Sequence, residues 1–367
     1  MHLTDPAGKP ARRGPGPNRS GPGAWLRACV AGLAVLAGLA LPAVSSSPAW
    51  ADPSPDAYVT NFGSGNVSVI DTTTNTDVAT IPVGTGPQGV AITPNGRRAY
   101  VTNRTSNTVS VIDTTTNTDV ATIPVGTGPI GIAITPNGRR AYVTNVLSGV
   151  SVINTTTNTV VATVPVGTFP GQVAITPNGR RAYVTNFGSG NVSVIDTTTN
   201  TVVDTIPVGT GPIGIAITPN GRRAYVTNFG SGNVSVIDAT TNTVVATIPV
   251  GTNPHDVAIT PNGRRAYIVA NNGTNDVSVI DTATNAVVDT IPVSGIVTGG
   301  VAITPNGRRA YVAVGSSNDV QVIDTTTNTV VATVPVGAGP AAVAITPGNG
   351  KNHKPHKPEE PKKPGHH

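Results

Sequence analysis

The side chains best suited to acid–base chemistry or ligand binding gather between residues 255 and 319. This stretch contains the only histidine between residues 57 and 347, together with extra carboxyl and amide groups. The set consists of His255, Asp256, Asn271, Asn272, Asp276 and Asp319. A histidine beside an aspartate suits general acid–base catalysis, and oxygen ligands of this kind suit Ca²⁺. We therefore predict a ligand-binding sector here, with Ca²⁺ as its candidate metal.

Three interpretations of this sector remain open. It could be ordinary variation of solvated loops, because Asn, Asp and Gly are the usual turn residues. It could be a polar or cation-binding patch. It could also be a lyase- or hydrolase-like site in which His255 is the base and Asp256 or Asp276 orients it. Residues 57–347 contain no Cys, Lys or Glu, which limits the acid–base groups to aspartates and His255. We assign no catalytic residue from the sequence.

The elements that must position these residues belong to a repeat. All seven tyrosines lie in copies of the motif Thr-Pro-Asn-Gly-Arg-Arg-Ala-Tyr-Val-Thr-Asn, spaced 42, 42, 41, 42, 42 and 44 residues apart. In the unit 99–135, alternating apolar residues predict strands at 99–103, 109–113, 120–125 and 132–135. The Asn-Gly pair between units predicts a type I′ hairpin turn. Four short strands in about 42 residues are typical of a propeller blade.

The ends of the repeat region predict how the ring closes. Residues 57–83 supply three strands of a blade, and residues 343–346 supply an innermost strand without a partner. A proline near the end of every third strand marks the outer edge, because proline cannot donate to a sheet ladder. We therefore predict an all-β, seven-bladed β-propeller of four-stranded antiparallel blades. The N- and C-terminal strands share one blade in a three-plus-one closure.

The repeat resembles a known family. The runs Ala-Tyr-Val-Thr-Asn, Val-Ser-Val-Ile-Asp, Val-Ala-Thr-Ile-Pro-Val-Gly and Val-Ala-Ile-Thr-Pro-Asn-Gly are similar to those of YVTN-family β-propeller repeat proteins. The resemblance implies an exported or cell-surface interaction scaffold, although some related propellers bind DNA or act as lyases. Metal-dependent lactonase-like propellers share this topology but use a glutamate ligand, which residues 57–347 lack. The resemblance assigns no catalytic residue.

The two ends of the chain have different compositions. Residues 1–51 combine basic residues, an apolar run at 28–44 and the small-x-small sequence Ala49-Trp50-Ala51, which predicts a cleaved signal peptide. Residues 52–56 form a short linker, and residues 57–347 form the propeller. The Pro-, Lys- and His-rich tail 348–367 is expected to be disordered. These features predict a protein that is secreted or cell-surface associated, without a membrane span after cleavage.

Charged residues recur in register within the repeat. Residues 57–347 contain 13 Arg and 13 Asp, and twelve of the arginines form Arg-Arg pairs. They could form an anion-binding ring, or each could pair with an aspartate across the strands, as Arg98 would with Asp113. The balance of charge favours pairing, so nucleic acid is an unlikely partner. Two loop departures also stand out: Arg104 replaces a phenylalanine and Phe169 replaces a glycine.

From these observations we predict a secreted, non-catalytic β-propeller scaffold. Its partner is expected to be a protein or cell-surface polymer, and the chain is expected to be monomeric. No cofactor is predicted apart from Ca²⁺. The alternatives are a lyase- or hydrolase-like propeller enzyme using the His255/Asp256 loop sector, and a DNA- or anion-binding propeller using the Arg-Arg face.

Overall fold

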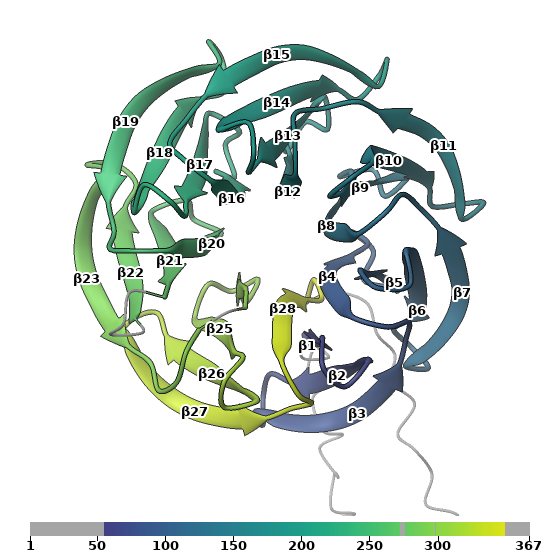
Figure 1. Cartoon of the computed structure of the whole chain (residues 1–367). Helices are drawn as coiled ribbons and strands as arrows, with labels where there is room; N and C mark the ends of the chain where they lie inside the picture. Colours follow the sequence, from purple (N-terminus) through teal and green to yellow (C-terminus); the bar gives the residue numbers. More distant parts are fainter. Residues whose placement is uncertain (1–54, 272–275, 298, 349–367) are drawn as a thin grey trace, which may run out of the picture. The chain divides into compact units, whose positions relative to one another are not determined.

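The chain folds into a seven-bladed β-propeller. The computed structural model describes residues 55–271, 276–297 and 299–348. Within these ranges, 28 strands form seven four-stranded antiparallel sheets arranged in a ring (Figure 1). The described residues include no helix long and apolar enough to cross a membrane. The predicted fold class is confirmed; the proposed signal peptide 1–51, most of the linker and nearly all of the tail lie outside the described residues.

Each blade runs from an innermost to an outermost strand, and we number the blades in chain order. The first blade contains β28 (Pro340–Ile345), β1 (Asp56–Asn61), β2 (Asn66–Asp71) and β3 (Thr76–Pro82). The second contains β4 (Pro87–Ile92), β5 (Arg98–Asn103), β6 (Thr108–Asp113) and β7 (Thr118–Pro124). The third contains β8 (Pro129–Ile134), β9 (Arg140–Asn145), β10 (Gly149–Asn154) and β11 (Thr159–Val164). The fourth contains β12 (Pro170–Ile175), β13 (Arg181–Asn186), β14 (Asn191–Asp196) and β15 (Thr201–Pro207).

The remaining three blades include the predicted ligand-binding sector. The fifth contains β16 (Pro212–Ile217), β17 (Arg223–Asn228), β18 (Asn233–Asp238) and β19 (Thr243–Pro249). The sixth contains β20 (Pro254–Ile259), β21 (Arg265–Ala270), β22 (Asp276–Asp281) and β23 (Ala286–Pro292). The seventh contains β24 (Val301–Ile303), β25 (Arg309–Val314), β26 (Asp319–Asp324) and β27 (Thr329–Pro335). The predicted prolines stand at the end of the outermost strands or directly after them.

The first blade closes the ring as predicted. Strand β28 pairs antiparallel with β1, with Tyr58 opposite Ala344. Beyond the end of β28, the Asp56 N–H donates to Thr346 Oγ1 at 2.8 Å, and the Thr346 N–H donates to the Asp56 carbonyl at 2.9 Å. The edge of the N-terminal strand β1 is therefore covered by the last strand of the chain, which becomes the innermost strand of the blade.

The turn between blades differs from the predicted type I′ hairpin. The Gly96 N–H donates to the Thr93 carbonyl at 2.7 Å, which encloses Pro94 and Asn95 as the two central residues. A type I′ turn needs positive φ at both central residues, but proline fixes φ near −65°. Only the following Gly96 has a positive φ, of 70°. The prediction of type I′ is wrong because Pro94 imposes a type I turn, and Gly96 provides the left-handed residue after it.

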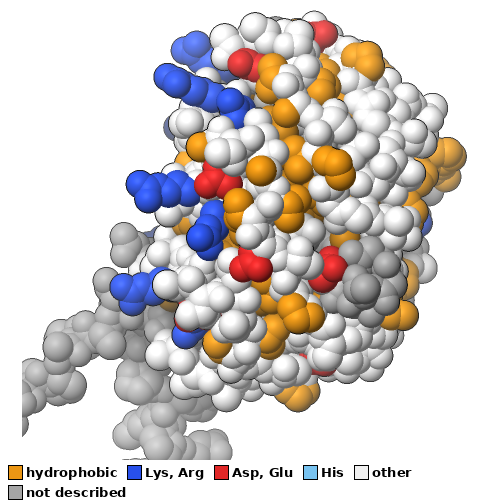
Figure 2. All heavy atoms as spheres, turned by 90° about the vertical axis from the view of Figure 1, so that its left-hand side faces the viewer, with side chains coloured by type: hydrophobic (Ala, Val, Ile, Leu, Met, Phe, Trp, Pro, Cys, Tyr) orange, Lys and Arg blue, Asp and Glu red, His pale blue; other side chains and the backbone are white. Residues whose placement is uncertain are grey.

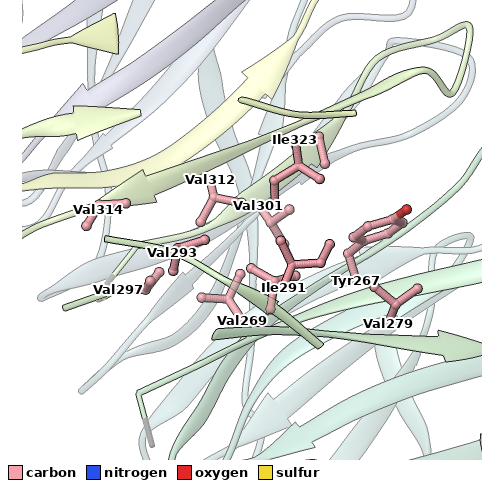
Figure 3. Packing of buried hydrophobic residues seen from close by; sticks show 12 residues of the cluster. Tyr267, Val269, Val279, Ile291, Val293, Val297, Val301, Val312, Val314 and Ile323 are labelled. Atoms are coloured by element: carbon pink, nitrogen blue, oxygen red, sulfur yellow. The ribbon is translucent and has the colours of Figure 1, made fainter. Parts of the chain in front are cut away.

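Aliphatic side chains and tyrosines fill the space between neighbouring blades. All seven tyrosines are fully buried. Figure 3 shows the cluster between the sixth and seventh blades, where Tyr267 and Val269 face Val301 and Val312. Each tyrosine hydroxyl donates to a turn asparagine of the next blade; Tyr58 reaches Asn117 at 2.6 Å. The Tyr311 hydroxyl reaches Asn75 in the first blade at 2.6 Å, so the same bond recurs where the ring closes.

Candidate functional site

The His255–Asp256 pair lies on β20, the innermost strand of the sixth blade. Both side chains are partly buried. The position of Asp256 is occupied in the other innermost strands by a small residue or by glutamine: Gly89, Gly131, Gln172, Gly214, Gly300 and Ala342. A single carboxylate therefore breaks the sevenfold repetition close to the axis of the ring.

Glycine on either side of Asp256 makes room for it, because the innermost strands approach closely. A Cβ on Gly214 would lie 2.7 Å from the His255 carbonyl oxygen and 2.8 Å from Asp256 Cα. On the other side, a Cβ on Gly300 would lie 2.7 Å from Asp256 Oδ2. The carboxylate of Asp256 thus lies in space that Gly300 leaves open, whereas Gly214 leaves room for the backbone of β20.

A threonine bridges neighbouring blades at the first five sites around the ring. Thr227, for example, accepts a hydrogen bond from the Gly214 N–H at 2.8 Å and donates to the His255 carbonyl at 3.3 Å. In the sixth blade Val269 replaces this threonine and lies opposite Asp256. Instead, Asp256 Oδ2 accepts a hydrogen bond from the Val301 N–H of the seventh blade at 3.0 Å. The aspartate therefore supplies the link between blades that the missing hydroxyl group would otherwise make.

The surroundings of Asp256 favour its protonated form. Burial raises the pKa of this carboxyl to about 6, although hydrogen bonds from the Val301 and Val257 backbone partly oppose the shift. Such a carboxylate is a stronger base than an ordinary aspartate and is still largely ionised at neutral pH. Titration near the working pH is typical of catalytic groups, although structural groups also show it.

His255 lies against an aromatic ring from the neighbouring blade. Its imidazole packs edge-on against Phe229, which follows β17, with the ring centroids 5.1 Å apart. Burial lowers the pKa of His255, so the ring is neutral at pH 7. Its Nε2 atom is buried and has no hydrogen-bond partner among the described residues. Because buried polar atoms are normally paired, this unpartnered nitrogen is unusual for a packed position and marks the sixth blade as a place where the repeat is interrupted.

The other residues of the predicted sector do not gather around this pair. Asn271 follows β21, and its N–H donates to the Asn253 carbonyl at 3.2 Å. Asp276 opens β22 opposite Ala270, whereas Asp319 opens β26 in the next blade opposite Val314. Asn272 lies outside the described residues. The part of the chain that is described contains no group of three or more His, Cys, Asp or Glu able to hold a metal ion. The described residues therefore contain no carboxylate cluster of the kind that the Ca²⁺ hypothesis requires.

At the opposite end of the blades, the aspartates serve mainly to hold turns. The predicted register is confirmed, with Arg98 opposite Asp113. However, only Arg181–Asp196 and Arg309–Asp324 form ion pairs among the described residues. The turn aspartates accept backbone hydrogen bonds: Asp113 Oδ1, for example, accepts from the Thr115 N–H at 2.8 Å. Figure 2 shows aspartates beside the row of arginines along one edge of the molecule. Positive charge on this face is accompanied by negative charge.

Phe169, a departure from the repeat that was not included in the predicted site, meets Leu147 at a pocket. Phe169 and Leu147 line a recess between the third and fourth blades. Sequence comparison of the units identifies Phe169 as unusual but does not show that it meets Leu147. Leu147 lies in a loop of the third blade, and Phe169 lies in the connection to the fourth blade, 22 residues later in the chain.

Comparisons with known proteins support the propeller and point to enzymes. A family model described as a seven-bladed β-propeller lactonase matches residues 45–203. A second model, described as a YNCE-like β-propeller, matches residues 171–262. No curated protein sequence matches the chain.

Solved structures share the fold over most of the chain. Hydrazine synthase from Kuenenia stuttgartiensis is 26% identical, with a TM-score of 0.65 over 70% of this chain and 88% of that one. Dihydro-heme d1 dehydrogenase NirN is 18% identical, with a TM-score of 0.62 over 80% and 76%. A protein from Bacteroides uniformis provisionally assigned as a 6-phosphogluconolactonase is 18% identical, with a TM-score of 0.68 over 80% and 100%.

These comparisons correct the functional expectation. The prediction of a non-catalytic binding scaffold is wrong, because the family model matching residues 45–203 describes a lactonase and the solved structure that is 26% identical is that of a hydrazine synthase. The same findings agree better with the alternative of a propeller enzyme. The physical reason for the error is that a near-identical repeat mainly specifies the scaffold, and the few residues that carry chemistry contribute little to its pattern. The chain is a seven-bladed β-propeller whose known counterparts include enzymes.

Proposed function

We propose that this protein is a hydrolytic propeller enzyme that opens cyclic esters, with its site at His255 and Asp256. The observation that carries the proposal is the partly buried carboxylate of Asp256 on an innermost strand, beside an imidazole nitrogen without a partner. The match of residues 45–203 to a lactonase family model supports the choice of substrate class. The proposed site lies outside that segment, so the two observations are independent.

The chemistry follows from the two side chains. Ionised Asp256 takes a proton from water, and the water oxygen forms a bond to the lactone carbonyl carbon. The ring C–O bond then breaks, and the ring oxygen takes the proton from Asp256, which yields a hydroxy acid. We assign neutral His255 to substrate positioning: its ring packs against Phe229, and Nε2 reaches a polar group of the substrate only after a local movement of the side chain. The Val301 N–H fixes the carboxylate through Oδ2, which limits its rotation.

A proton-release assay on a lactone panel tests the proposal. The panel contains glucono-1,5-lactone, its 6-phosphate and γ-butyrolactone, each compared with its spontaneous hydrolysis. Asp256→Asn is expected to lower kcat by at least about 100-fold, the usual contribution of general base catalysis. Wild-type activity is expected to increase with pH as Asp256 ionises, around its pKa of about 6.

The chain offers a matched control at the equivalent position of the fourth blade. Gln172→Ala changes a polar residue at the place that corresponds to Asp256 and is expected to keep the activity. His255→Gln is expected to raise KM more than it lowers kcat, because we assign this residue to substrate positioning. The proposal fails if no lactone is hydrolysed above its spontaneous rate, or if Asp256→Asn retains wild-type turnover.

We also propose that the repeats are of the YVTN type and that the protein is exported as a monomer. The motif runs quoted above support the repeat type, and the small-x-small sequence before residue 52 supports export. N-terminal sequencing of the secreted protein is expected to find Asp52 as the first residue. Retention of residues 1–51 in the mature protein would contradict cleavage.

A further inference from the structure

A second candidate binding site lies on the third and fourth blades, on the face where their β9–β10 and β11–β12 loops meet. A pocket of ≈ 520 Å³ is lined there by apolar side chains that include Val146, Leu147, Val166 and Phe169. Leu147 is 68% exposed and Phe169 is 51% exposed. A volume of this size lies within the range usual for small-molecule sites.

Phe169 is held in a backbone conformation that bulky residues rarely adopt. Its φ is 51°, in the left-handed region. The equivalent loop residues of five other blades are four glycines and one asparagine, which tolerate this region: Gly86, Gly128, Gly211, Gly339 and Asn253. The Phe169 ring lies over Gly188, where an added Cβ would be only 2.6 Å from Phe169 Cδ2.

This conformation is not offset by burial of the ring. A strained residue persists when its surroundings stabilise it or when it serves a function. About half of the Phe169 side chain faces solvent. The neighbouring Leu147 is also largely exposed. Its loop, between β9 and β10, is one residue shorter than the corresponding loops of the second, fourth and fifth blades. A bound apolar group would cover both side chains.

A positive charge adjoins this apolar pocket. A second recess of ≈ 500 Å³ shares Val146 and Leu147 with the first and adds Arg104 and Phe62. Arg104 is exposed and forms no ion pair within the described part of the chain. The twelve other arginines of the described residues occur as pairs at the opposite ends of the blades. Arg104 therefore places an uncompensated guanidinium beside an exposed apolar surface.

We propose that the two adjacent recesses bind a small anionic amphiphile. Its apolar part occupies the pocket between Leu147 and Phe169, and its carboxylate or sulfonate contacts Arg104. The combination of an apolar lining and one positive charge distinguishes this site from the His255–Asp256 site on the sixth blade. The proposal does not rest on the proposed hydrolase activity.

Competition with a fluorescent probe tests the site in the full-length chain. The anionic probe 1-anilinonaphthalene-8-sulfonate is bound first, and decanoate or neutral 1-decanol is then added below the concentration at which it aggregates. Both compounds are expected to displace the probe. Leu147→Ser and Phe169→Gly are each expected to weaken decanoate by about tenfold, through loss of buried apolar contact. Arg104→Gln is expected to weaken decanoate about fivefold but to leave 1-decanol unchanged.

Phe169→Gly carries a second readout that a merely structural role would not give. It introduces the residue found in four sister blades, so it is expected to preserve or raise Tm while weakening binding. Val245→Ser, at an equally exposed valine on the outer strand β19, is the control and is expected to change neither. Unchanged decanoate affinity in both Leu147→Ser and Phe169→Gly would overturn the proposal. Sedimentation with phosphatidylglycerol vesicles without displacement by decanoate would also overturn it, in favour of a lipid surface.

Discussion

Asp256 links neighbouring blades where a neutral hydroxyl group makes the link elsewhere in the repeat, and we propose that the same carboxylate is the base of the site. In five blades a threonine hydroxyl joins neighbouring innermost strands; Thr102, for example, donates to the Ile130 carbonyl at 2.7 Å. Val269 removes that hydroxyl in the sixth blade, and the Asp256 carboxylate accepts a hydrogen bond from the next blade instead. In the sixth blade, an ionisable carboxylate thus replaces a neutral hydroxyl group as the link between blades, at a partly buried position. Burial of this kind costs stability and is typical of functional sites.

This cost leads to a prediction about stability and pH. The folded-state pKa of Asp256 is about 6, raised from 3.8. The stability associated with its protonated form is therefore fully present below pH 4 and lost as pH rises through 6. Asp256→Asn keeps an oxygen acceptor for Val301 but cannot ionise. As the pH rises from 4 to 8, we expect the free energy of unfolding of the variant to increase relative to that of wild type by up to about 3 kcal/mol.

Denaturant unfolding at several pH values measures this difference. The difference in the free energy of unfolding between wild type and variant excludes the contributions of the other carboxyl groups, because these groups titrate in both proteins. A difference that does not change between pH 4 and 8 would show that Asp256 is not destabilised by ionisation. Gain of stability together with loss of lactone hydrolysis would identify a functional carboxylate.

Sequence reasoning located His255 and Asp256 but could not find their surroundings. Both residues stand out because the other copies of the repeat differ from them. Their contacts with Phe229 and Val301 arise from neighbouring blades, and the Asp256–Val301 bond joins residues 45 positions apart. The arginine–aspartate register was predictable from strand pairing. Only two of these arginine–aspartate pairs form ion pairs among the described residues, because the same carboxylates accept hydrogen bonds from backbone N–H groups of the turn.

At the level of the element, a hydrogen bond from each tyrosine fixes a turn of the next blade. The Tyr183 hydroxyl donates to Asn242 Oδ1 at 2.7 Å. Asn242 has a φ of 56°, so its backbone favours Asn or Gly. Tyr183→Phe is expected to destabilise the protein by about 1 kcal/mol, the usual net contribution of one hydrogen bond. Thermal or denaturant unfolding measures the effect.

A double-mutant cycle separates this bond from other effects of the substitutions. Asn242→Gly keeps the left-handed backbone but removes the acceptor. In the Tyr183→Phe background, Asn242→Gly should therefore cost about 1 kcal/mol less than in wild type. Strictly additive effects would contradict a direct interaction between the two side chains.

The turn aspartates give the fold a separate dependence on pH. Backbone hydrogen bonds from the turn, led by that of Thr326, hold the pKa of Asp324 below its ordinary value, and Arg309 contributes. A lowered pKa gives stability that is present above pH 4 and lost as pH falls through the folded-state pKa. We expect Asp324→Asn to keep the turn, because Asn154 makes the same contact with the Thr156 N–H at 2.9 Å.

Melting temperatures between pH 2 and 7 test this assignment. At pH 7, Asp324→Ala is expected to lower Tm more than Asp324→Asn, because alanine offers no acceptor to the turn. On acidification, the difference between wild type and Asp324→Asn is expected to shift in favour of the variant. Equal Tm values for the alanine and asparagine variants at pH 7 would indicate that Arg309 is the more important partner.

On the scale of the whole molecule, the repeat made the fold predictable. The alternation of apolar residues, the strand prolines and the position of the last strand each specified one feature of the ring, and all three agree with the structure. Strand boundaries were predicted within about three residues, with the innermost strands beginning earlier than expected. The pocket beside Phe169 was not predictable, because it depends on the approach of two loops and on a side chain in a rare conformation.

Closure of the ring gives the last prediction. Strand β28 covers β1, and Val343 packs with Ala57, Val59 and Tyr311 between the first and seventh blades. Removal of residues 340–367 would expose the edge of β1 and these aliphatic side chains. We expect the free energy of unfolding to fall by at least about 4 kcal/mol, from Val343 and Ile345 alone, and the truncated chain to associate with itself through the open edge.

Unfolding and size-exclusion chromatography measure the two effects. Removal of residues 349–367 is the matched control and is expected to leave Tm unchanged. A monomeric chain of unchanged Tm without residues 340–367 would show that the ring does not need its closing strand.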